Sequence, residues 1–144
     1  MTIEDNKSIA QRWLMDLWSK GNLDIADQVL ATDYTRHDRE FPLKGPEAYK
    51  EFIKAFREVL LDMEFTEDHI VAEGEKIYVR WKARASLRSG KQGEINGTDL
   101  LRIVDGKIVE SWPLFDALSL MRQMGLLRFL FLVRKIKRSL ADPY

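Results

Sequence analysis

Residues 76–87 alternate strictly between apolar and polar side chains, and this pattern constrains the fold more than any other part of the chain. A period of two over so long a run is typical of a β-strand with one face buried and one face in water. The chain must therefore build a sheet that other elements cover on its apolar side. The apolar positions are Ile77, Val79, Trp81, Ala83, Ala85 and Leu87, and the polar ones are Lys76, Tyr78, Arg80, Lys82, Arg84 and Ser86.

A β-hairpin is indicated in residues 97–115. Asp105-Gly106 separates two β-rich runs, and this dipeptide is the strongest short-range signal for a two-residue hairpin turn. If these two residues form the turn, the register places Asp99 opposite Trp112. Residues 63–72 are a further, weaker strand candidate.

The first part of the chain has the pattern of helices. Thr2 and Asp5 form a start similar to a capping box, and apolar residues follow at helical spacing. Gly21 supplies a stop, and Asn22 supplies the N-cap of a second, short helix. Pro46 suits the first position of a third helix. Helices followed by successive antiparallel strands indicate an α+β fold, in which the helices cover the apolar face of one curved sheet.

A concavity between the curved sheet and the helices would form a pocket. The residues available to line it are mostly aromatic, so the pocket would be apolar. We expect its lining to come from Trp13, Trp18, Phe52, Phe56, Trp81 and Trp112.

Composition excludes several classes of function. The chain has no cysteine, which rules out disulfides and thiolate chemistry. Lys+Arg and Asp+Glu both total 23, so no global field attracts nucleic acid. His37 and His69 are the only histidines and show no metal-ligand spacing, and no phosphate or dinucleotide motif occurs. We therefore expect no metal and no cofactor. Without a signal-peptide core or an apolar run of ~20 residues, we expect a cytoplasmic protein.

Two aspartates, Asp99 and Asp116, lie within apolar runs, where a carboxylate without a partner costs free energy. Asp116 is either a general acid/base at the pocket edge or the N-cap of a following helix. Asp99 either faces the pocket beside Trp112 or forms an ordinary ion pair. A bulge at Pro113 would move Asp116 to the sheet face of Arg102, which makes Arg102 a conditional candidate for binding an anionic group.

Three segments together resemble the SnoaL-like polyketide cyclase family of the nuclear transport factor 2-like superfamily. They are "DNKSIAQRWLMDLWSKGNLDIADQVLATDYTRHD", "KGPEAYKEFIKAFREVLLDMEF" and "GTDLLRIVDGKIVESWPLFDALSLMRQMG". The resemblance implies a cone-shaped, cystatin-like α+β barrel with a deep pocket, which forms a homodimer through its sheet. It also implies that Asp116 is an acid/base and that His37 lies near the pocket mouth. The superfamily contains cofactor-free isomerases, dehydratases and epoxide hydrolases as well as non-catalytic members.

The chain divides into a SnoaL-like domain, residues 1–125, and a C-terminal segment, residues 126–144. Residues 126–140 contain five basic residues and no acidic one, so the rest of the chain carries a formal charge of −5. Apolar residues recur there at helical spacing, which predicts an extra amphipathic, basic helix. This helix could dock on the body or on a dimer partner, touch anionic lipid or an acidic partner as a weak surface contact, or cover the pocket.

We therefore expect a small-molecule pocket protein that acts as a cofactor-free acid/base enzyme of the cyclase, isomerase, dehydratase or hydrolase type. Its substrate would be apolar or aromatic. The alternative is a non-catalytic ligand-binding or protein-interaction module of the same fold. The candidate catalytic residues are Asp116, His37 and Asp99. The candidate ligand-binding residues are Trp13, Trp112, Arg102, Tyr34, Phe56 and Trp81.

Overall fold

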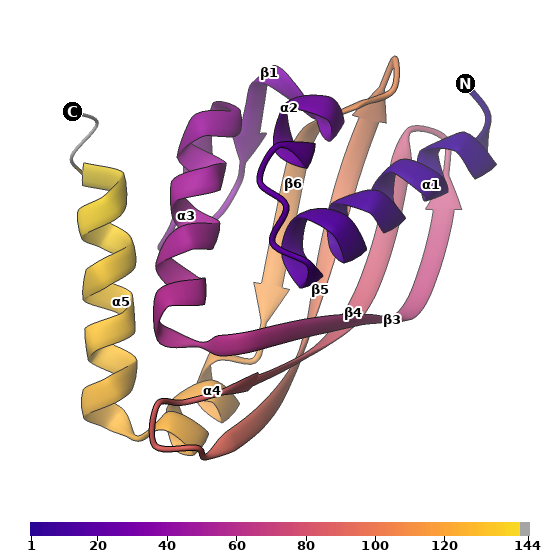
Figure 1. The fold of residues 1–144 in the computed structure, drawn as a ribbon. Coiled ribbons are helices and arrows are strands. Elements are labelled where there is room, and N and C mark those ends of the chain that lie inside the picture. Colours follow the sequence, from indigo (N-terminus) through magenta and orange to yellow (C-terminus); the bar gives the residue numbers. More distant parts are fainter. Residues whose placement is uncertain (142–144) are drawn as a thin grey trace.

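The computed structural model describes residues 1–141 and shows a curved six-stranded sheet with helices against one of its faces (Figure 1). The strand order is β2-β1-β6-β5-β4-β3. In chain order the elements are α1 (Ile3–Arg12), η1 (Trp13–Ser19), α2 (Ile25–Val29), β1 (Leu30–Arg36), β2 (Leu43–Lys44), α3 (Gly45–Val59), β3 (Leu61–Glu73), β4 (Lys76–Ser86), β5 (Gln92–Val104), β6 (Lys107–Phe115), α4 (Ala117–Met124) and α5 (Leu126–Ala141). The expected α+β cone with an extra C-terminal helix is confirmed.

The N-terminal helix begins with the predicted capping box. The backbone N–H of Asp5 donates to Oγ1 of Thr2, and the backbone N–H of Thr2 donates to the Asp5 carboxylate. The helix continues into η1 as a wider π-helical segment that buries both of its tryptophans, Trp13 and Trp18. α2 has Asp24 as its N-cap, whereas the sequence indicated Asn22. The carbonyl of Asn22 instead accepts the backbone N–H of Ile25 in a turn.

The long alternating run forms β4, which pairs antiparallel with β3 on one side and with β5 on the other. Its apolar positions 77, 79, 81 and 83 are buried and face the helices, as the alternation predicted. β1 pairs with β6 in the parallel direction, which the sequence did not indicate. Parallel pairing is possible here because the long chain between these strands allows a crossover.

The β5–β6 hairpin has the predicted two-residue turn at Asp105 and Gly106. Both have positive φ values, 49° and 78°, as a type I′ turn requires. Ile103 lies opposite Ile108, which agrees with the predicted register next to the turn.

A β-bulge then changes the register of the hairpin. Val109 is an extra residue on β6, so Glu110 lies opposite Arg102 and every later pair moves by one position. Asp99 consequently lies opposite Pro113, and the predicted pairing of Asp99 with Trp112 is wrong. The pattern had suggested a bulge at Pro113, whereas it occurs four residues earlier.

The C-terminal helix α5 docks on the body beside α3 (Figure 1). Leu132 and Ile136 are buried in this contact, and the Lys135 ammonium pairs with the Glu58 carboxylate of α3. Within residues 1–141, no helix combines the length and hydrophobicity needed to cross a bilayer.

Candidate functional site

A cavity of about 100 Å³ lies between the helices and the inner face of the sheet. Its deep walls are almost entirely aromatic and aliphatic, with residues from η1, α3, β3 and β4. An apolar cavity of roughly 150 Å³ can hold a benzene molecule, so the present volume accommodates at most about one ring. The deep lining comprises Trp13, Trp18, Tyr49, Phe52, Phe56, Leu60, Met63, Phe65 and Trp81.

The cavity opens at the end of the sheet where β4 turns into β5 and where α4 crosses. Exposed Lys91 and Gln92 line it there, together with Gln123 and Met124 of α4. Gln123 ties α4 to the sheet, because its amide accepts the backbone N–H of Glu94 and donates to the Glu94 carbonyl. No residue of α5 lines the cavity among those described, so the expectation that this helix covers the pocket finds no support.

Asp99 is the acidic side chain buried in the cavity wall, with 6% of its surface exposed. Burial raises its pKa from the usual 3.8 to about 6, because a carboxylate loses its hydration there. The hydrogen bond from the Trp81 indole and the positive charge of Arg36 oppose this rise, whereas the charge of Asp38 adds to it. A carboxyl group with this pKa exists in both protonation states near neutral pH.

The Asp99 carboxylate is held by one indole. Nε1–H of Trp81 donates to Oδ2 of Asp99 over 3.0 Å. Oδ1 accepts no hydrogen bond from residues 1–141, which leaves it available to a ligand. Gly97 allows this arrangement, since a Cβ atom built on it would lie 2.2 Å from the Trp81 ring.

Arg36 is a second buried charge on the cavity lining. Its Nη1 donates to the Asp38 carboxylate over 2.7 Å and to the Phe41 carbonyl over 2.8 Å. Its guanidinium also lies over the Phe52 ring, 4.5 Å from the centroid. These contacts hold the cation at the apolar cavity and leave other guanidinium N–H groups for a ligand.

Tyr49 brings a hydroxyl group to the cavity. It accepts the indole N–H groups of both Trp13 and Trp18, over 2.8 and 2.7 Å. Burial raises the pKa of Tyr49, and the charge of Asp99 raises it further, so the hydroxyl keeps its proton. With two donors already on its oxygen, the Tyr49 O–H is free to donate.

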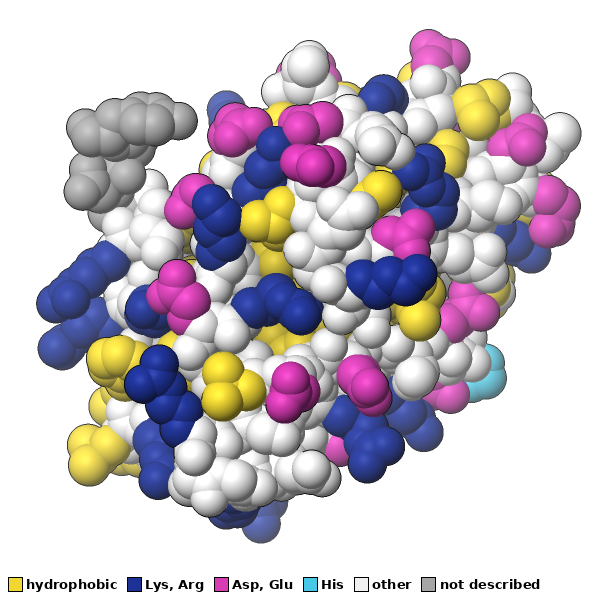
Figure 2. All heavy atoms as spheres, in the orientation of Figure 1, with side chains coloured by type: hydrophobic (Ala, Val, Ile, Leu, Met, Phe, Trp, Pro, Cys, Tyr) yellow, Lys and Arg dark blue, Asp and Glu magenta, His cyan; other side chains and the backbone are white. Residues whose placement is uncertain are grey.

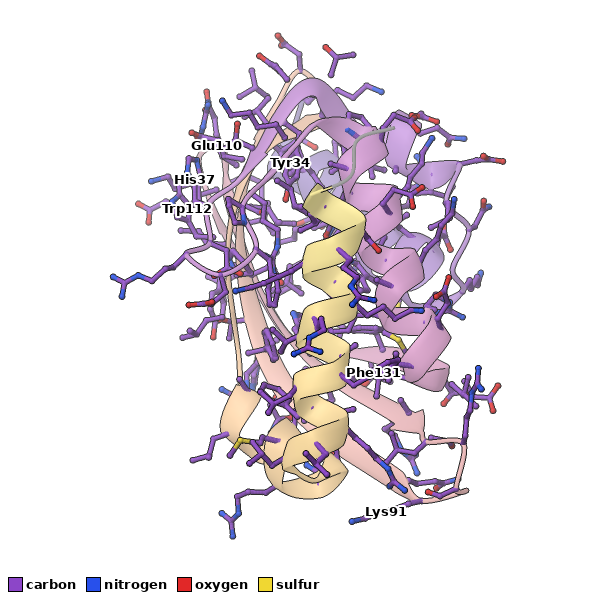
Figure 3. All side chains as sticks on the ribbon, turned by 90° about the vertical axis from the view of Figure 1, so that its left-hand side faces the viewer. Tyr34, His37, Lys91, Glu110, Trp112 and Phe131 are labelled. Carbon is purple, nitrogen blue, oxygen red and sulfur yellow. The ribbon has the colours of Figure 1, made fainter. Side chains whose placement is uncertain are left out.

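Three of the expected site residues, His37, Arg102 and Trp112, lie on the outer face of the sheet, away from the helices. Figure 3 shows His37, Glu110 and Trp112 grouped on that side. The His37 ring stacks on the Trp112 indole with 5.0 Å between centroids, and its Nε2 lies 3.2 Å from the Glu110 carboxylate. Arg102 donates to Glu110 over 2.6 Å and to Glu75 over 3.2 Å. The bulge placed Trp112 on this face, so His37, Arg102 and Trp112 are separated from the cavity by the sheet.

Asp116 and Tyr34 also lie outside the cavity lining. Asp116 is exposed, and its side chain accepts the backbone N–H of Ser119 over 2.9 Å as the N-cap of α4. Tyr34 is buried behind Tyr49, where it hydrogen-bonds to Ser111. The expected residues that line the cavity are Trp13, Trp18, Phe52, Phe56, Trp81 and Asp99.

The cavity also contains polar residues that the sequence did not single out. Arg36 lies in a turn-rich stretch whose pattern gave no signal of burial. Tyr49 was expected on the inward face of its helix, and a buried tyrosine with a polar end is a usable signal for a site. Within residues 1–141, acidic and histidine side chains form no cluster of three that could hold a metal ion.

The curved sheet, the helices on its inner face and the apolar cavity between them form a cyclase-type fold of the class that binds small molecules. Residues 8–124 match the SnoaL-like polyketide cyclase family, and the chain belongs to that family. Among curated proteins, a search gives no match.

Solved structures of the same fold agree with this assignment. A candidate polyketide cyclase from Bacillus cereus superposes with a TM-score of 0.78 at 26% identity, over 85% of this chain and 81% of that one. One from Acidithiobacillus ferrooxidans gives 0.75 at 26% identity, over 85% and 96%. TsrD from Streptomyces laurentii gives 0.78 over 87% and 98%, and at 22% identity this likeness supports the fold alone.

Proposed function

We propose that this protein binds a small, largely apolar or aromatic carbonyl compound in the cavity and that Asp99 acts on it as a cofactor-free general acid/base. The observation that carries the proposal is the buried Asp99 carboxyl in an aromatic wall, with one oxygen held by Trp81 and a pKa of about 6. A general base is most effective when its pKa lies near the working pH.

In this reaction, Oδ1 of Asp99 removes a proton from the carbon next to the ligand carbonyl. The C–H electron pair moves into the new C=C bond of an enolate, and the negative charge collects on the carbonyl oxygen. The protonated Asp99 then returns the proton to carbon. Return to a different carbon of a conjugated enolate would be isomerisation. Attack of the enolate carbon on a second carbonyl, whose oxygen takes the bond's electron pair and then the proton held by Asp99, would be cyclisation.

The enolate oxygen needs donors that exist before the reaction, because preorganised donors stabilise charge most in a site that excludes water. Tyr49 and Arg36 supply them in this proposal. The Tyr49 oxygen already accepts two indole N–H groups, which leaves its own O–H as a donor. The guanidinium of Arg36 is fixed by Asp38 and Phe41 at the cavity wall.

The family assignment and the cavity support an apolar ligand. The Bacillus cereus and Acidithiobacillus ferrooxidans structures are described as candidate polyketide cyclases, and a polyketide offers acidic C–H groups beside carbonyls. The inner part of the cavity holds at most about one ring. A longer substrate would therefore extend past Lys91 and Gln123 into solvent.

Acetophenone is a suitable probe, because it combines one aromatic ring with an exchangeable methyl group beside a carbonyl. Quenching of tryptophan fluorescence measures its binding, and NMR in D₂O follows deuterium incorporation into the methyl group. We expect the protein to accelerate exchange and Asp99→Asn to reduce the rate at least ~100-fold, with binding changed only a few-fold.

Asp116→Asn is the matched control, because asparagine is also a good N-cap. We expect this variant to exchange at the rate of the unmodified protein. Loss of exchange in Asp116→Asn but not in Asp99→Asn would instead support the role that the family resemblance implies for Asp116. Binding without any exchange would support the non-catalytic ligand-binding module, and the absence of binding would contradict the cavity proposal itself.

We also propose that two copies pair through the outer face of the sheet. Trp112 and Leu114 of β6 and Tyr78 of β4 are exposed there, with Leu114 74% exposed. Exposed apolar groups that share one sheet face are typical of an interface. Leu114→Glu should convert a dimer to a monomer in sedimentation velocity, and a monomeric unmodified protein would contradict the pairing.

A further inference from the structure

The outer face of α5 exposes large apolar side chains to solvent. Leu127 is 83% exposed and Phe131 is 60% exposed, with Leu126 and Leu130 exposed beside them. Figure 2 shows apolar side chains at the surface in the region of the first turns of α5, with Lys and Arg side chains around them. Docking of the helix on the body therefore buries only one of its sides.

The basic residues of α5 divide into two groups by their contacts. The two lysines bind the body, since Lys135 pairs with Glu58 over 2.5 Å and Lys137 with Glu40 over 3.4 Å. The arginines project from the helix without such anchors. In the described part of the chain, no carboxylate lies within ion-pair distance of Arg128, Arg134 or Arg138, and all three are exposed.

Leu127, Phe131, Arg134 and Arg138 lie at spacings of four, three and four residues, so they share one stripe along the helix. Exposed Leu and Phe side chains together with basic residues are features of helices that bind the surface of a membrane, and here the arginines follow the apolar groups in the later turns. We propose that the outer face of α5 docks on an anionic lipid bilayer, with Leu127 and Phe131 in the interface and the arginines on the headgroup phosphates.

A second copy of the chain is a less suitable occupant of this face. Symmetric pairing of α5 with α5 would set the arginines of one copy against those of the other if the helices run parallel, and against Leu127 and Phe131 if they run antiparallel. Neither arrangement gives the arginines a partner of opposite charge. A single amphipathic helix with few cations gives weak, reversible membrane binding. We therefore expect a peripheral contact.

Docking would bring the segment that carries the cavity opening close to the bilayer. Gln123 and Met124 line the opening, and only Gly125 separates them from the start of α5 at Leu126. An apolar ligand could then pass between the lipid and the cavity without crossing bulk water. The docking itself does not depend on the chemistry proposed for Asp99.

Sedimentation of the full chain with vesicles tests the proposal. We expect it to sediment with vesicles of phosphatidylcholine and phosphatidylserine, and far less with phosphatidylcholine alone or at high salt. Leu127→Ser combined with Phe131→Ser should weaken partitioning on the order of tenfold or more. Arg134→Gln and Arg138→Gln should each weaken it about fivefold. Ile3→Ser is the matched control, because Ile3 is an exposed apolar residue at the start of α1, far from α5 (Figure 1).

Several outcomes would overturn the proposal. They are failure of the unmodified chain to sediment with the anionic vesicles, equal partitioning of the Leu127 and Phe131 double variant, or equal loss in Ile3→Ser. Dissociation of a dimer by the double variant, without vesicle binding by the unmodified chain, would assign the face to a second copy. Circular dichroism and Tm check folding, and the arginine variants provide an independent test if the double variant unfolds.

Discussion

The indole of Trp81 donates a hydrogen bond to the carboxylate of Asp99 on the neighbouring strand, and both side chains lie on the inner face of the sheet. The residue directly opposite Trp81 is Gly97, and the one opposite Asp99 is Val79, so the contact is diagonal across the strand pair. Gly97 leaves the space over which the indole reaches the carboxylate. Two strands thus fix a titratable group in an apolar wall.

The exchange reaction should depend on pH through Asp99. Only the ionised carboxylate can remove a proton, and burial raises the pKa of Asp99 to about 6. We expect the rate of deuterium incorporation to rise with pH and to reach half its maximum near pH 6. NMR exchange rates from pH 4 to 8 measure this, and a midpoint near pH 4 would show a solvated carboxylate.

Ionisation of Asp99 should also lower the free energy of unfolding, so stability should fall over the pH range in which the exchange rate rises. The pKa of Asp99 is higher in the folded protein than the usual 3.8, so the folded state binds the proton more tightly. Stability is therefore greatest below about pH 4 with respect to this group, and falls as pH rises to about 6. The loss amounts to roughly 3 kcal/mol.

Asp99→Asn isolates this contribution from the other carboxylates. Urea denaturation at pH 4 and at pH 7 should show the variant gaining stability relative to the unmodified protein by up to about 3 kcal/mol at the higher pH. A pH-independent difference between the two proteins would show that Asp99 is not desolvated.

Gly97→Ala should disturb the Trp81–Asp99 pair. The new methyl group would meet the Trp81 ring at 2.2 Å, and such overpacking typically costs about 1–3 kcal/mol. Urea denaturation measures the loss. In a double-mutant cycle, Trp81→Phe should relieve much of it, because the smaller ring leaves room for the methyl group. Additive effects of the two substitutions would contradict this contact.

Asp116→Ala should destabilise the protein by about 1 kcal/mol, because it removes the acceptor for the Ser119 backbone N–H at the start of α4. Asp116→Asn should cost much less, since asparagine can also cap. Chemical denaturation of both variants measures the two losses. Equal effects of the two substitutions would show that Asp116 does not cap α4.

Local patterns in the sequence predicted most of the elements. The capping box of Thr2 and Asp5, the strand over residues 76–86 and the turn at Asp105-Gly106 all follow from interactions between residues close in the chain. The alternation also predicted the burial of Trp81, because a strand covered on one side has only one inward set of positions.

The bulge at Val109 could not be predicted from local patterns. Nothing in the local pattern of β6 distinguishes a regular ladder from one with an extra residue, and one extra residue exchanges the two faces of the strand beyond it. That exchange moved Trp112 to the outer face beside His37 and brought Pro113 and Phe115 to the cavity.

The sequence by itself therefore determined the fold class and the aromatic character of the cavity, since these depend on periodicity and residue type, and the resemblance of three segments indicated the family. Only the tertiary structure decided that Asp99 is the acid in the cavity wall and that Arg36 and Tyr49 accompany it. The burial of a charged group depends on neighbours from four elements, β1, α3, β4 and β5, which the chain order does not place together. For the same reason, only the docked position of α5 shows which of its residues remain exposed.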